Sequence, residues 1–95
     1  MPANDNVALP AGAWTLLTSN DVTALRVQNL GSEAVYIKAR VGTGALSSLG
    51  GSICLDSFMA LGADMTLADL FPGVPGANRV YALSETGGLV SVSHA

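Results

Sequence analysis

The side chains that most often carry chemistry are sparse in this 95-residue sequence, which contains one histidine, His94, and one cysteine, Cys54. Nucleophilic catalysis needs a base that contacts the nucleophile and a third group that orients the base. His94 is the one histidine that could serve as such a base, and it is next to the last residue. The serines form no G-x-S-x-G motif. We therefore expect no catalytic residues, and we expect His94 to have a structural place at a strand end or a subunit contact.

Carboxylates, metal ligands and glycine-rich loops give no stronger signal. Asp64 and Asp69 could in principle act as the paired carboxylates of a glycosidase, but neither belongs to a motif, and both fit turn or cap positions better. One histidine and one cysteine cannot form a structural zinc site. The Gly-rich segment 42–52 lacks the Lys-Ser/Thr ending of a phosphate-binding loop. We expect no cofactor and no metal, and we expect Cys54, which has no cationic neighbour in sequence, to be a small buried hydrophobic residue.

The aromatic residues leave a binding function open. Trp14, Tyr36 and Tyr81 could stack against sugar rings, although Trp14 and Phe71 fit a core position better. A sugar-binding module is therefore kept as an alternative. We take Trp14, Tyr36, Tyr81, Phe71 and His94 as the candidate interface residues.

Alternation of apolar and polar residues predicts strands over residues 24–30 and 34–41. Only a short turn containing Gly31 separates them, so we expect an antiparallel hairpin. Two further alternating stretches, 79–84 and 89–94, flank ETGG and predict a closing hairpin whose last strand is integral to a sheet. One core should collect the inward-facing residues Leu25, Val27, Val35, Ile37, Ala39, Val41, Val80, Ala82, Val90 and Val92.

Turn-forming residues divide the rest of the chain into short segments. We expect a flexible polar arm over residues 1–6, a loop over 42–52, one helical turn over 57–61, and a strand or short 3₁₀ element over 65–71. Seven to eight short antiparallel strands with turns about every ten residues are typical of a β-sandwich. The sequence predicts an all-β, single-domain, jelly-roll-like β-sandwich over residues 1–95, with at most one short helical turn.

The composition favours a protein that assembles with others. Charged residues make up 12% of the chain and hydrophobic residues 49%, whereas ordinary soluble domains are about 25% charged. Depletion of charge is typical of interface cores, and large exposed apolar patches usually mark interaction sites. We therefore expect a homo-oligomer or a component of a larger assembly.

Two classes of partner are disfavoured by the same residues. The chain has no run of about 20 apolar residues that could span a bilayer, and its start resembles no signal peptide. Its four basic residues are too few for the basic face that nucleic-acid binding needs. We expect neither membrane nor nucleic acid as a partner, and synthesis in a reducing cytoplasm.

Two stretches of the chain resemble a known class of proteins. VALPAGAWTLLTSNDVTALRVQNLGSEAVYIKA, residues 7–39, and FPGVPGANRVYALSETGGLVSVSHA, residues 71–95, are similar to the opening and closing parts of small all-β virion proteins of tailed bacteriophages and prophages. The shared features are an apolar strand, a P-x-G break with an aromatic residue, and a hairpin of the type "vqN-G-…-vyi", with a gap of a few residues before "vyi". The segment 46–64 carries no signature of this class.

The resemblance implies a capsid decoration (cement) protein and brings no catalytic residues with it. Such a protein would bind the major capsid protein or another virion protein and would be assembled into the virion in the host cytoplasm. We expect a homotrimer as the first choice, because decoration sites commonly lie on local three-fold axes, or else a monomer that multimerises only on a symmetric shell. The alternative is a tail- or fibre-associated β-domain that binds a host surface glycan. Neither hypothesis predicts an enzymatic activity.

Overall fold

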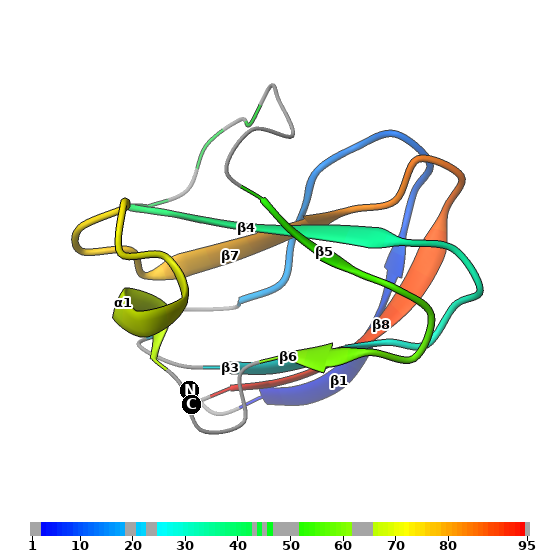
Figure 1. The fold of residues 1–95 in the computed structure, drawn as a ribbon, viewed down its shortest axis with the longest axis horizontal. Coiled ribbons are helices and arrows are strands. Elements are labelled where there is room, and N and C mark those ends of the chain that lie inside the picture. The colour runs from blue at the N-terminus through cyan, green and yellow to red at the C-terminus, as the bar shows by residue number, and fades with distance from the viewer. Residues whose placement is uncertain are drawn as a thin grey trace.

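The computed structural model describes residues 3–18, 21–22, 25–42, 44, 46, 52–61 and 66–94. The elements in these ranges follow one another along the chain as β1 (Ala3–Leu9), β2 (Thr15–Leu16), β3 (Leu25–Asn29), β4 (Val35–Arg40), β5 (Ile53–Leu55), β6 (Ala60–Leu61), α1 (Leu67–Leu70), β7 (Arg79–Leu83) and β8 (Gly88–His94) (Figure 1).

The described strands form two four-stranded sheets that face each other. The first sheet has the order β1-β8-β3-β6 and the second β2-β7-β4-β5, and neighbouring strands are antiparallel. The chain pairs β1 with β8, β2 with β7, β3 with β6, and β4 with β5, so its first half runs alongside its second half. A long antiparallel ribbon wound in this way is a jelly roll. The predicted all-β, jelly-roll-like sandwich is confirmed.

Both predicted hairpins are wrong. β3 and β4 lie in different sheets, and so do β7 and β8. Alternation determines which face of a strand is buried, but it does not determine the neighbouring strand. Alternation is equally consistent with consecutive strands in opposite sheets, because the apolar face of each sheet points toward the interior between them. The closing strand β8 is nevertheless integral to its sheet, where it pairs with both β1 and β3.

The core lies between the sheets and contains most of the residues predicted for it. Nine of the ten are buried, with exposed fractions of 4% or less: Leu25, Val27, Val35, Ile37, Ala39, Val80, Ala82, Val90 and Val92. The exception is Val41, whose side chain is 53% exposed. β4 ends at Arg40, and Gly42 has a φ of 69°, so the chain turns away before Val41 can face inward.

The N-terminal segment differs from the expected flexible arm. Residues Ala3 to Asn6 belong to β1 and pair with β8, in a register that places Ala3 opposite His94. Pairing satisfies backbone groups of β8 that would otherwise form an open sheet edge. The polar residues of this segment do not alternate with apolar ones, so the sequence pattern predicted no strand. The segment is a strand because its backbone pairs with β8.

The helical turn lies later in the chain than predicted. Residues 57–61 form a turn followed by β6, whereas the short helix is α1. Thr66 and Asp69 make reciprocal side-chain to backbone hydrogen bonds of 3.2 and 3.3 Å, which form a capping box. Asp69 therefore has the cap role expected of it, while Asp64 lies outside the described residues. Leu67 and Phe71 are buried and belong to the hydrophobic core.

Candidate functional site

Several connections between strands of opposite sheets gather at one end of the sandwich, at the right of Figure 1. A bridge joins Ala11 to Ser84, and the amide of Gly12 donates to the carbonyl of Ser84 at 2.8 Å. The Ser57 hydroxyl donates to the carbonyl of Gly31 at 2.7 Å. We call this surface the loop end and define it by residues 10–14, 30–34, 56–59 and 84–87. The helix α1 lies at the opposite end (Figure 1).

The loop end is held together by Asn29, the last residue of β3, whose side chain is fully buried. Its Nδ2 group donates to the carbonyl oxygens of Glu33 at 2.7 Å, Leu55 at 3.1 Å and Asp56 at 3.3 Å. Its Oδ1 atom accepts from the amide of Gly31 at 2.9 Å. A buried amide with both ends satisfied fixes its neighbours in one arrangement. Asn29 thus holds the β3–β4 and β5–β6 connections against each other.

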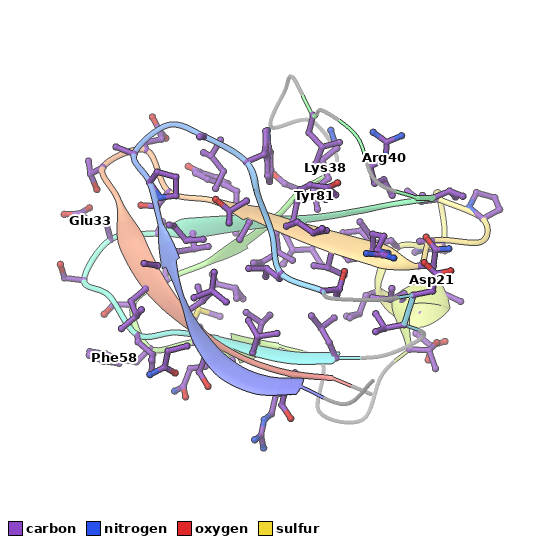
Figure 2. All side chains as sticks on the ribbon, turned by 180° about the vertical axis from the view of Figure 1, so that it is seen from behind. Asp21, Glu33, Lys38, Arg40, Phe58 and Tyr81 are labelled. Carbon is purple, nitrogen blue, oxygen red and sulfur yellow. The ribbon has the colours of Figure 1, made fainter. Side chains whose placement is uncertain are left out.

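Phe58 and Met59 project from the β5–β6 connection. Phe58 has a φ of 62°, the left-handed region that side-chain-bearing residues rarely adopt. Its side chain is 65% exposed and that of Met59 is 48% exposed. Figure 2 shows Phe58 at the same end of the molecule as Glu33. We call Phe58 and Met59 the apolar tip.

A shallow depression of about 310 Å³ lies between the β3–β4 and β7–β8 connections, and it is lined by Glu33, Ala34, Tyr36, Glu85 and Thr86. The pKa of Tyr36 is raised above its ordinary value, first by the negative charge of ionised Cys54, its partner across β4 and β5, and then by the charge of Glu85. Partial burial and a hydrogen bond to Glu85 act in the same direction. The depression therefore combines a phenol ring with two carboxylates.

Charge is distributed unevenly along the molecule. The loop end contains Glu33, Asp56 and Glu85 and no lysine or arginine. The basic residues lie on β3, β4 and β7, and the ends of β4 and β7 that carry Arg40 and Arg79 point away from the loop end. Figure 2 shows Lys38 near the middle of the molecule and Arg40 farther from Glu33. The loop end is therefore acidic.

The structure separates the predicted interface residues into three groups. Tyr36 lines the depression, and half-buried Trp14 ends the β1–β2 connection, so both belong to or border the loop end. Phe71 and Tyr81 are buried, with 6% and 7% exposed, and the Tyr81 hydroxyl accepts from the amide of Gly44 at 2.9 Å. His94 lies in β8, and its side chain is outside the described part of the structure.

The expectation that Cys54 is buried is wrong, because it is exposed on β5, an outer strand of the second sheet. Leu55 takes the inward position of this strand, so the preceding residue must face outward. Four further residues at the loop end were not predicted from the sequence: Asn29, Glu33, Phe58 and Glu85. Asn29 did carry a signal, since it is a polar residue at an inward position of an alternating strand.

The described residues contain no group of three or more histidine, cysteine, aspartate or glutamate side chains placed to hold a metal ion. No helix among them is long and apolar enough to cross a membrane. Comparisons with protein-family models, with curated proteins and with solved structures give no match.

Proposed function

We propose that this protein is a structural component of a bacteriophage virion, of the capsid-decoration (cement) type, that binds and stabilises the phage head. The observation that carries the proposal is the outer face of the first sheet. The outward positions with described side chains are Asn6, Ala8, Arg26, Gln28, Ala60, Leu89, Ser91 and Ser93, and Arg26 is the one charged residue among them. A broad sheet face so poor in charge has the composition of an interface core.

The topology supports the same proposal by analogy. Jelly rolls recur in viral capsid and lectin domains, although a fold alone does not assign a function. The sequence resemblance to phage virion proteins favours the viral use of this architecture over the lectin use. The proposed partners are the major capsid protein or another virion protein and further copies of this chain, with a homotrimer as the first choice. The proposed location is the virion, assembled in the host cytoplasm.

Binding to purified phage shells tests the proposal. We expect the protein to co-sediment with expanded shells in a saturable way and to raise the temperature at which the shells disrupt. Light scattering of the free protein should give a trimer, or a monomer that multimerises only on the shell. A strict monomer at high concentration that also fails to bind shells would contradict the proposal.

A tail- or fibre-associated domain that binds a host surface glycan is the second candidate, and the depression at the loop end favours it. Tyr36 offers a ring, and Glu33 and Glu85 offer acceptors for sugar hydroxyl groups. Titration of host surface polysaccharide, followed by calorimetry, separates the two functions. Glycan binding that Tyr36→Ala abolishes, without any binding to shells, would establish the second candidate in place of the first.

A further inference from the structure

The apolar tip is an exposed hydrophobic surface within the loop end. Phe58 is the most exposed of the large hydrophobic side chains in the described residues, and Met59 is its neighbour. Leu89, with 38% of its side chain exposed, follows the β7–β8 connection, and its carbonyl accepts from the amide of Leu30 at 2.9 Å. Single exposed hydrophobic residues are common on protein surfaces, so exposure alone does not assign a role to the tip.

The backbone at Phe58 makes its exposure informative. An aromatic residue with positive φ strains the chain, and its mostly exposed ring recovers little by packing against the core. Three hydrogen bonds hold this conformation: Gln28 Nε2 to the Phe58 carbonyl at 3.0 Å, the Asn29 amide to the Met59 carbonyl at 2.9 Å, and the Met59 amide to the Asp56 carbonyl at 3.0 Å. The surrounding structure therefore fixes an outward-pointing aromatic side chain at a local cost. Phenylalanine and methionine are enriched in protein interfaces relative to the rest of the surface.

The charges around the tip indicate the chemistry of its partner. Glu33 and Asp56 lie in the two connections that Asn29 joins, and Glu85 lies across the depression from Glu33. Because the loop end contains no lysine or arginine, a partner with acidic residues would be repelled. A partner with lysine or arginine around an apolar socket would match both the charges and the tip.

We propose that the apolar tip is the anchor by which the loop end docks into an apolar socket, rimmed by basic side chains, on the shell protein. The proposal rests on the decoration function, because it takes the shell protein as the partner. It assigns a shell contact to the loop end, in addition to any contact made by the outer face of the first sheet. Phe58 supplies the buried area, and Glu33, Asp56 and Glu85 supply the complementary charge.

The first test separates an anchor from a structural residue. Asparagine adopts the left-handed conformation more readily than phenylalanine, so Phe58→Asn should melt at a temperature equal to or a few degrees above that of the unchanged protein in a calorimetric scan. A clear drop in the melting temperature would mean that Phe58 stabilises the fold, and this would overturn the proposal.

The second test measures the affinity for purified expanded shells, with Val41→Ser as the matched control. Val41 is 53% exposed and follows the end of β4 that points away from the loop end, so its substitution should leave the affinity unchanged. Phe58→Asn should weaken binding at least tenfold. If the unchanged protein binds and Phe58→Asn binds equally well, the anchor is refuted while the decoration function stands. If the unchanged protein does not bind shells, the decoration function fails, and the anchor with it.

The third test concerns the basic rim. Attraction between an acidic surface and a basic one weakens as salt rises. Binding of the unchanged protein to shells should therefore fall as the salt concentration increases, and the combined Glu33→Gln and Glu85→Gln substitutions should reduce that dependence. Binding that does not change with salt concentration would contradict the proposal that basic side chains surround the socket.

Discussion

Asn29 occupies the last inward position of β3, opposite the core residue Val90, where alternation would place a hydrophobic side chain. Its amide group joins two connections that are far apart in the sequence, and all of its polar atoms have partners. Burying an amide is costly unless it is hydrogen-bonded. The loop end is therefore held in place by a buried side chain, inside the protein and not at its surface.

Replacing Asn29 with alanine should lower the free energy of unfolding by about 2–4 kcal/mol, because the buried Leu55 carbonyl and the partly buried Glu33 carbonyl and Gly31 amide lose their partner. Denaturant titration followed by tryptophan fluorescence measures this change. Gln28→Ala is the matched control, since Gln28 is the preceding residue and makes one exposed hydrogen bond, to the Phe58 carbonyl. Its cost should stay within about 0.5 kcal/mol. Equal costs for the two variants would show that Asn29 does not hold the connections.

The raised pKa of Tyr36 predicts a change in stability at high pH. The folded protein holds the phenol proton more tightly than the unfolded chain does. The resulting stability is present in full below the ordinary tyrosine pKa of about 10 and is lost as pH rises through the raised value. Titration of the Tyr36 ring signals by NMR should give a pKa above 10. Cys54→Ser should lower the pKa most and Glu85→Gln less, whereas a pKa unaffected by both substitutions would contradict the assigned causes.

β1 shows that a segment can form a strand although its own residues do not alternate between apolar and polar. The alternating apolar residues of β8 face the core, whereas the polar start of β1 is ordered by its pairing with β8. β8 lies between β1 and β3, so each of its edges has a partner. The order of the N-terminal segment therefore depends on the C-terminal strand.

Removing residues 2–6 tests whether this segment is a strand or an arm. The deletion removes the pairing of Ala3–Asn6 with β8. It should lower the free energy of unfolding by about 2 kcal/mol, because each backbone hydrogen bond contributes about 0.5–1.5 kcal/mol net. Thermal unfolding followed by circular dichroism measures the loss. A shortened chain that melts at the full-length temperature would show that the segment is a dispensable arm.

Across the molecule, the sequence predicts features that depend on neighbouring residues, and it misses features that depend on residues far along the chain. Period-two alternation identifies β3, β4, β7 and β8 and their buried faces, because the direction of a side chain depends only on the strand that carries it. The pairing of these strands depends on residues far along the chain, and both predicted hairpins failed for that reason. Glu33 and Glu85 meet only because the topology brings two distant connections together. The left-handed conformation of Phe58 had no signal in its residue type.

The position of β8 in its sheet has a consequence for synthesis of the chain. β8 separates β1 from β3, yet it is the last of the strands to be synthesised. Until then, each of those two strands has a side without its native partner, and the nascent polypeptide carries open edges that can pair with another molecule. Distant pairings are also slow to form. We therefore expect the first sheet to be completed late in folding, and the edges of β1 and β3 to be open to pairing with other chains until β8 takes its place.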